Sequence, residues 1–148
     1  MPLKDSAIIE ALWVKRAHRG VLDAHTAVDL VEGAGVAESA DRGGKRQVTV
    51  LSAEAWEAAC REIGRELDPV LRRANVLVRG MDFEATRGQV LQLGTARLEI
   101  WGETVPCKLM EETAPGLLDA LLPHWRGGAF GTVQTGGTVR VGDGARWL

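Results

Sequence analysis

Apolar residues along this chain fall in short runs that are separated by glycine-rich turns. Runs of β-branched and aliphatic residues bounded by glycine are typical of strands joined by tight turns. The pattern predicts strands at 8–17, 47–51, 75–79, 89–93, 97–101, 128–134 and 138–141. The last two are joined through Thr135-Gly136-Gly137, where glycine supplies the positive φ of a tight hairpin turn. We therefore expect a mainly β fold with mostly antiparallel pairing.

The strand at 47–51 leads into a helix. Ser52 is placed to cap it, and Pro69 stops the run. The stripe at helical spacing consists of Trp56, Ala59, Cys60, Ile63 and Leu67. Because Cys60 lies in this apolar stripe, we expect it to be a buried, unreactive thiol. A second, shorter helix is predicted at 115–122, opened and closed by proline. The remaining strands suggest a closed or nearly closed barrel, which leaves few exposed edges.

Length and charge narrow the function classes. At 148 residues the chain is expected to be one domain, 1–148. A formal net charge of −2 argues against the broad basic face that nucleic acid or an anionic membrane requires. No apolar run approaches the roughly 20 residues of a membrane span. Two cysteines without metal-binding spacing are expected to stay reduced thiols. We therefore expect a cytoplasmic protein that binds neither nucleic acid nor membrane.

One of the two cysteines has an unusual setting. Cys107 directly follows Pro106 at the end of a strand-like run, and Lys108 comes next. A thiolate is both a nucleophile and a metal ligand, and nearby positive charge favours it. Cys107 is therefore the candidate reactive residue, with Lys108 as its neighbouring cation. The alternative is a structural cysteine at the junction of a strand and a turn.

Arginines supply the other half of the candidate site. Arg46, Arg73 and Arg126, with Asn75, are candidates to surround an anion, because a guanidinium presents a planar fork suited to phosphate. Arg73 and Asn75 are expected to share one face of a strand, since alternate residues point to the same side. Arg72 is expected to be solvated. For Arg46 and Arg126 a salt bridge or a solvated surface position is the alternative.

Four stretches resemble a known family. They are GGKRQVTVLSAEAW at 43–56, LRRANVLVRGMDF at 71–83, GETVPCKLM at 102–110 and WRGGAFGTVQTGGTVRVGD at 125–143. Their order and spacing resemble those of the MOSC domain, named for the C-terminal domain of molybdenum cofactor sulfurase, in its small stand-alone bacterial form. The resemblance implies a MOSC-like β-barrel with two or more peripheral helices. It also implies that Cys107 is the family's characteristic cysteine, in sulfur or molybdenum cofactor chemistry.

The resemblance is weaker just before the strand at 47–51. The family usually has a glycine followed by Asp or Asn there, whereas this chain has Glu38 and Ser39. Glycine permits backbone conformations that glutamate resists. If this turn forms a pocket wall, we expect a pocket that differs from the family's.

Three functions remain open. The first is a sulfur carrier, in which Cys107 accepts a persulfide sulfur from a partner such as a pyridoxal-phosphate cysteine desulfurase. The second, as the resemblance implies, is a component of a molybdenum cofactor reductase, with Cys107 as the molybdenum ligand. Its cofactor-binding residues would then be Arg73, Asn75, Arg46, Lys108 and Arg126. The third is a binding module without this chemistry. Because cofactor-binding reductases of the family are longer and carry an additional barrel, the first function is favoured.

Overall fold

The computed structural model describes residues 7–40 and 44–148, and within them strands predominate. The strands are β1 (Ala7–Lys15), β2 (Leu22–His25), β3 (Ala27–Val31), β4 (Gly35–Val36), β5 (Val48–Ser52), β6 (Val76–Arg79), β7 (Val90–Leu93), β8 (Ala96–Glu103), β9 (Ala129–Thr135), β10 (Gly137–Arg140) and β11 (Gly144–Trp147). All strands predicted from the sequence are present. β2, β3, β4 and β11 were not predicted, because they are short, at two to five residues each.

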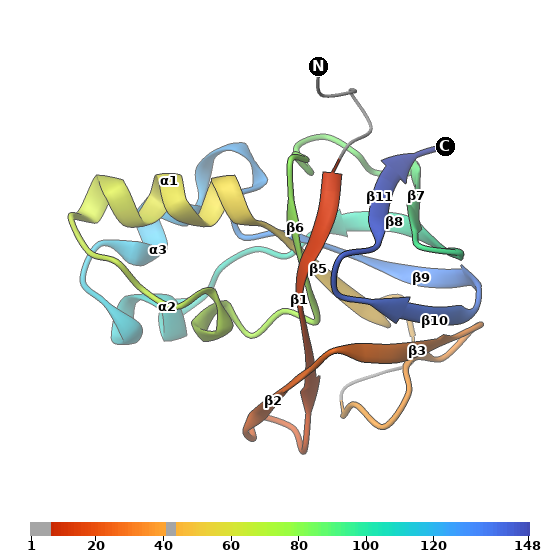
Figure 1. Cartoon of the computed structure of the whole chain (residues 1–148). Helices are drawn as coiled ribbons and strands as arrows, with labels where there is room; N and C mark the ends of the chain where they lie inside the picture. Colours follow the sequence, from red (N-terminus) through yellow and green to blue (C-terminus); the bar gives the residue numbers. More distant parts are fainter. Residues whose placement is uncertain (1–6, 41–43) are drawn as a thin grey trace.

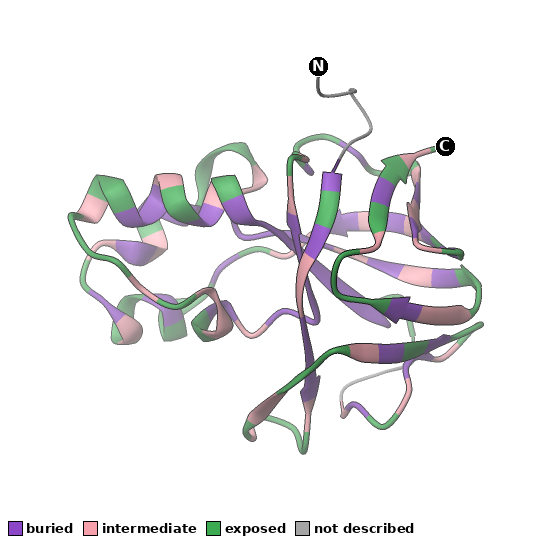
Figure 2. Cartoon of the chain, in the orientation of Figure 1, coloured by how far each residue is buried: buried purple, intermediate pink, exposed green. Residues whose placement is uncertain are grey.

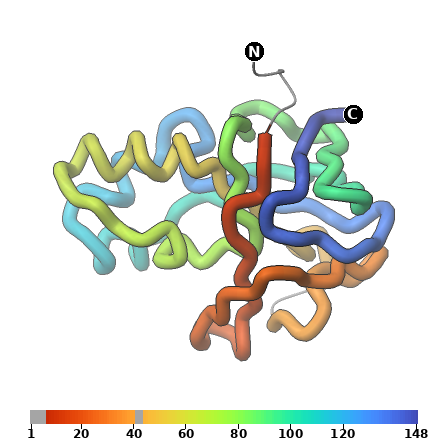
Figure 3. Tube along the Cα trace, viewed as in Figure 1, coloured from red at the N-terminus to blue at the C-terminus, as the bar shows by residue number. Residues whose placement is uncertain are grey.

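The main sheet closes into a barrel. Its strand order is β11-β7-β8-β9-β5-β6-β1-β2, and β11 also pairs with β1, so every strand but β2 belongs to the ring. Figure 3 shows β1 in red beside β11 in dark blue at the point of closure. The pairing of β5 with β6 is parallel, and the other pairs are antiparallel. A small sheet, β10-β3-β4, lies beside the barrel. The predicted closed, mainly β fold is confirmed.

Three α-helices within the described ranges pack on one side of the barrel (Figure 1). They are α1 (Ala53–Ile63), α2 (Lys108–Thr113) and α3 (Leu117–Leu121), with the 3-10 turns η1 (Pro69–Arg72) and η2 (Pro123–Trp125). Ser52 caps α1 as predicted, its Oγ accepting from the Ala55 amide at 3.2 Å. Gly64, at φ 70°, ends α1 earlier than Pro69 would. The predicted helix at 115–122 is observed only as α3, because Gly116 at φ 88° precedes it.

Two hydrophobic cores share the wall formed by β5 and β6. Val48 and Val50 of β5 point into the barrel, whereas Leu51 packs against the helices. Every residue of β5 is therefore buried, since both faces of the strand are covered. In Figure 2 the buried faces of the helices turn toward one another and toward the barrel. None of the helices in the described part is long and apolar enough to cross a bilayer.

Candidate functional site

Cys107 lies where the barrel meets the helices. It is the residue immediately before α2, in extended conformation, and its side chain makes no capping hydrogen bond. Its carbonyl accepts from the Met110 amide at 2.9 Å, and the fully buried Met110 side chain anchors α2 in the helix-side core. Cys107 is exposed, whereas Cys60 is buried. The predicted difference in accessibility between the two cysteines is therefore confirmed. Burial also raises the pKa of the Cys60 thiol above its usual value.

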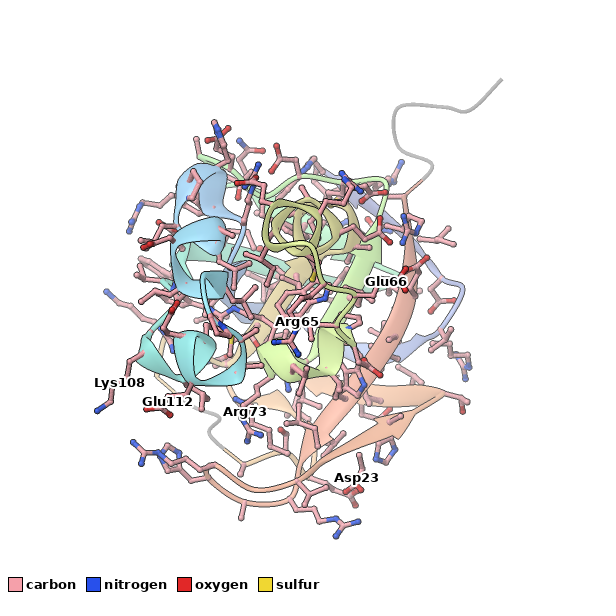
Figure 4. All side chains as sticks on the ribbon, turned by 90° about the vertical axis from the view of Figure 1, so that its left-hand side faces the viewer. Asp23, Arg65, Glu66, Arg73, Lys108 and Glu112 are labelled. Carbon is pink, nitrogen blue, oxygen red and sulfur yellow. The ribbon has the colours of Figure 1, made fainter. Side chains whose placement is uncertain are left out.

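Cys107 opens into a pocket of about 590 Å³, here called the thiol pocket. Its walls come from the β1–β2 turn, η1 and α2. The lining residues are Arg19, Leu22, Val70, Leu71, Arg73, Cys107, Lys108, Leu109, Glu112 and Thr113. Figure 4 shows Arg73 between α2 and the β1–β2 hairpin, whereas Lys108 extends outward from α2. Three cations, Arg19, Arg73 and Lys108, and one carboxylate, Glu112, thus line the pocket that holds the thiol.

A smaller cavity of about 110 Å³, here called the inner chamber, adjoins the thiol pocket. Arg73 and Leu109 line both cavities. The inner chamber is lined by Lys15, Arg46, Thr49, Val50, Arg72, Arg73, Ala74, Thr104, Leu109 and Gly127. Its charged lining residues are all basic, in a chain whose net charge is −2. The arginines have been brought together from the segments before β5 and around η1.

Arg72 is buried at the wall between the site loops. Its Nε donates to the Gly127 carbonyl at 2.8 Å, and its Nη2 donates to the Thr104 carbonyl at 2.9 Å. Burial lowers the pKa of Arg72, and Arg46 adds to this effect, whereas the charge of Cys107 opposes it. The expectation that Arg72 is solvated was wrong. Arg72 and Arg73 are adjacent and of the same residue type, so the sequence does not show which of them is buried.

Gly127 permits the close packing of these loops. A Cβ at this position would lie 2.6 Å from the Thr104 carbonyl oxygen and 3.1 Å from Cδ of Pro106. Both distances are shorter than ordinary van der Waals contact. Cys107 follows Pro106 directly, so the absence of a side chain at Gly127 helps to fix the segment that presents the thiol.

Arg73 and Asn75 do not share a strand face. Arg73 follows η1 in the left-handed conformation, φ 68°, and its Nη2 donates to the Gly20 carbonyl at 2.6 Å. β6 begins only at Val76. The left-handed residue turns the chain, so the alternation that predicted a common face does not apply, and that prediction was wrong.

Asn75 is buried behind the inner chamber. Its Oδ1 accepts from the Thr49 amide at 3.0 Å and from the Thr49 hydroxyl at 3.1 Å, and its Nδ2 donates to the Trp13 carbonyl. Thr49 lines the inner chamber, whereas Asn75 lines neither it nor the thiol pocket. Asn75 thus connects β1, β5 and the start of β6, and the Thr49 side chain lies between it and the inner chamber.

The structure separates the two remaining arginines. Arg46 lies over the Phe130 ring, 5.0 Å from its centroid, and lines the inner chamber. Arg126 forms an ion pair with Glu62 and donates to the Ala120 carbonyl at 3.0 Å. It lines a different pocket, at the beginning of α1, and does not meet Cys107. For Arg126 the salt-bridge alternative describes the observed contacts.

The turn that departs from the family pattern supports one end of this site. Glu38 adopts φ 67°, the left-handed conformation that glycine adopts most easily. Ser39 is buried, and its Oγ accepts from the Lys15 amide at 3.1 Å. Lys15 lines the inner chamber, so the turn retains a glycine-like backbone beside the cavity even though glutamate occupies the position.

Fold and site together define a small closed β-barrel with an exposed thiol beside a group of arginines. The chain belongs to the MOSC domain family, whose model matches residues 23–146. It is similar in structure to the YUAD protein from Bacillus subtilis, with a TM-score of 0.77, 23% identity and coverage of 94% of this chain and 93% of the other. No curated protein matches the chain in sequence.

Two further solved structures share the fold. YiiM from Escherichia coli has a TM-score of 0.68 at 15% identity, covering 95% of this chain and 69% of its own. YiiM from Geobacillus stearothermophilus has a TM-score of 0.68 at 16% identity, with coverages of 97% and 74%. At these identities the likeness concerns the fold.

Sequence reasoning missed most of the residues that line the cavities, and Arg19, Leu109 and Arg72 are examples. Arg19 lies in the β1–β2 turn, far from Cys107 in sequence, and Leu109 lies on α2. Arg72 was assigned to solvent. Arg19 adopts a left-handed φ of 58°, which the residue type arginine does not predict. The place of Leu109 in the cavity wall could have been inferred only from its position two residues after Cys107.

Proposed function

We propose that this protein is a sulfur carrier that holds sulfane sulfur as a persulfide on Cys107. The observation that carries the proposal is an exposed, free thiol in a cleft whose inner charged residues are basic. Cationic surroundings favour a thiolate, and a thiolate is the attacking species in sulfur transfer. Cys60 takes no part, because it is buried in the helix-side core.

The loading step needs no external oxidant or reductant. The Cys107 thiolate attacks the outer sulfur of a persulfide on the donor, forming a new S–S bond. The donor's S–S bond breaks, and its inner sulfur leaves as a thiolate with the bonding electron pair. Cys107 then carries the transferred sulfur, and the total charge is unchanged.

The donor that fits this step is a partner protein with a persulfide, for which a pyridoxal-phosphate cysteine desulfurase is our proposal. Leu71, Val105 and Leu109 are exposed apolar residues in or next to the segments that form the thiol pocket. Apolar surface around a reactive residue suits contact with a protein that must approach closely. We place the reaction in the cytoplasm, where a free thiol remains reduced.

The test is to incubate the purified protein with a cysteine desulfurase and cysteine, and to measure the intact mass with and without reductant. We expect a gain of one sulfur atom that reductant removes. The Cys60→Ala variant should show the same gain, and the Cys107→Ser variant should show none. Transfer that persists in Cys107→Ser, or no transfer to the wild type, would contradict the proposal.

A second candidate function is binding of the molybdenum cofactor, and the basic inner chamber is the observation that favours it. Cys107 would supply the protein thiolate to molybdenum, and Arg46 and Arg73 would hold the cofactor's phosphate. When bound, this cofactor supplies redox chemistry at its metal. The donor set fits, because one free, exposed thiol and several guanidinium groups are present. Within the described residues, no group of three or more His, Cys, Asp or Glu side chains could hold a metal ion.

Molybdenum analysis of protein produced in cells that make the cofactor distinguishes the candidates. Molybdenum bound in the wild type and lost in Cys107→Ser would favour the second function. If neither molybdenum nor transferable sulfur is found, the fold serves as a binding module without this chemistry.

A further inference from the structure

We propose that the inner chamber binds a small oxyanion of sulfur and that thiosulfate is a direct sulfur donor to Cys107. This inference rests on the proposed sulfur-carrier function and names a substrate class for it. The inner chamber and the thiol pocket share Arg73 and Leu109 as lining residues. An oxyanion in the chamber would therefore lie beside the route to the thiol.

The three arginines that line the inner chamber form no ion pair within the described residues. The hydrogen bonds of Arg72 go to two backbone carbonyls, and that of Arg73 goes to the Gly20 carbonyl. Arg46 contacts the Phe130 ring. The charge of Glu103 acts on Arg72, but the two form no ion pair. Three guanidinium groups that converge without a carboxylate make a site for an anion.

Unused hydrogen-bond donors remain in the inner chamber. A guanidinium has five N–H donors, and Arg72 uses its Nε and one Nη2 donor on carbonyls. Thr104 Oγ1 is buried and has no hydrogen-bond partner. A buried hydroxyl without a partner calls for an explanation, and an anionic oxygen would accept a hydrogen bond from it. Thr104 and Arg72 both line the inner chamber, so the residues that carry these donors border one cavity.

The size of the inner chamber selects a small ligand. Its volume of about 110 Å³ equals that of three or four water molecules at roughly 30 Å³ each. A tetrahedral oxyanion is of this size, whereas a fused-ring cofactor is not. Among small oxyanions, thiosulfate is one that carries a transferable sulfane sulfur.

The reaction is balanced. The Cys107 thiolate attacks the outer sulfur of thiosulfate, and a new S–S bond forms on Cys107. The S–S bond of thiosulfate breaks, and sulfite leaves with the bonding electron pair. A thiolate and a dianion repel each other, so the reaction needs positive charge between or beside them. Arg72 and Arg73 supply that charge, since Arg72 lines the inner chamber and Arg73 lines both cavities.

Binding is tested first in the Cys107→Ser protein, in which no transfer occurs. Calorimetric titration with thiosulfate should show binding, and Arg46→Gln or Thr104→Val in this background should weaken it at least about tenfold, the effect of one charge-assisted hydrogen bond. Arg97→Gln is the matched control, because this arginine is exposed on β8 and lines none of the cavities described above. Equal weakening by Arg97→Gln, or no binding at all, would overturn the proposal.

Transfer is then tested in the wild type by incubation with thiosulfate, measuring sulfite release and intact mass. We expect one sulfite per sulfur atom gained on Cys107, with slower loading in Arg46→Gln. If the desulfurase loads Cys107 and thiosulfate does not, this inference is wrong and the sulfur-carrier function stands. If neither donor loads Cys107 although thiosulfate binds, the assignment of thiosulfate as donor is likewise overturned.

Discussion

At the scale of single residues, backbone geometry controls the presentation of the thiol. Gly127 lets the Thr104 carbonyl approach to a distance that a Cβ would prevent. Arg72 then donates hydrogen bonds to the carbonyls of both residues and so connects their loops. Arg73 leaves η1 in the left-handed conformation and so turns toward the β1–β2 hairpin. The thiol of Cys107 therefore depends on neighbours that carry no reactive group.

Gly127→Ala is predicted to destabilise the protein by about 1–3 kcal/mol, because its Cβ would overlap the Thr104 carbonyl and displace the loop before Cys107. The measurement is the free energy of unfolding in urea, together with the rate of Cys107 alkylation. Gly144→Ala is the matched control, since a Cβ there meets only the Ala7 carbonyl, at 4.0 Å. Equal stability of the two variants would contradict the crowding argument.

At the scale of elements, one arginine connects three of them. Arg79 at the end of β6 bonds Glu10 of β1 and Glu57 of α1, and Glu54 of α1 lies within 3.5 Å of it. Glu54 also accepts from the Gly80 amide at 2.9 Å. This network fixes α1 against the barrel.

The Arg79 hydrogen bond lowers the pKa of Glu57 below its ordinary value of 4.5. The stabilisation from the Arg79–Glu57 interaction is therefore complete at pH values above the ordinary pKa of Glu57. It is lost as the pH falls through the lower pKa that Glu57 has in the folded state. Since both side chains are more than a third exposed, Glu57→Gln should reduce the free energy of unfolding by about 0.2–1 kcal/mol at neutral pH. Urea unfolding across the acid range should show this difference disappear.

Glu66→Gln is the control for this prediction, because Glu66 forms no ion pair within the part of the chain that the structure describes. Its stability should follow that of the wild type at every pH. A Glu57→Gln difference that persists at low pH would mean that the substitution acts by packing and not by charge.

At the scale of the whole molecule, barrel closure is the decisive contact. Ala145 of β11 pairs with Ala7 of β1 on one side and with Leu93 of β7 on the other. Its side chain is 1% exposed and belongs to the barrel core. Without this strand, β1 and β7 would each present an unpaired edge, which is a surface for association with other chains.

Ala145→Asp is predicted to destabilise the protein by roughly 3 kcal/mol or more, because it places an unpaired carboxylate in the barrel core. Size-exclusion chromatography should also detect oligomers. Arg146→Asp, on the exposed side of the same strand, should elute like the wild type and have nearly wild-type stability. Comparable damage from both variants would show that closure does not depend on this packing.

Local sequence patterns were sufficient to predict most of the secondary structure and which of the two cysteines is buried. Seven of the eleven strands and α1 followed from hydrophobic spacing and a serine cap, and the burial of Cys60 followed from its place on the apolar stripe. The exposed position of Cys107 followed from the proline before it. These features depend on interactions between residues close in sequence, so the order of residue types carries the information.

Which residues line the two cavities was decided by closure of the barrel. Arg19 lines the thiol pocket, and Arg46 and Arg72 line the inner chamber. They come from different segments, which non-local strand pairing brings together. Asn75 and Arg126 carry equally suitable groups, yet one is buried behind Thr49 and the other pairs with Glu62. A side chain's chemistry is fixed by its residue type, but its neighbours are fixed by contacts across the chain and by left-handed residues that reverse the expected alternation.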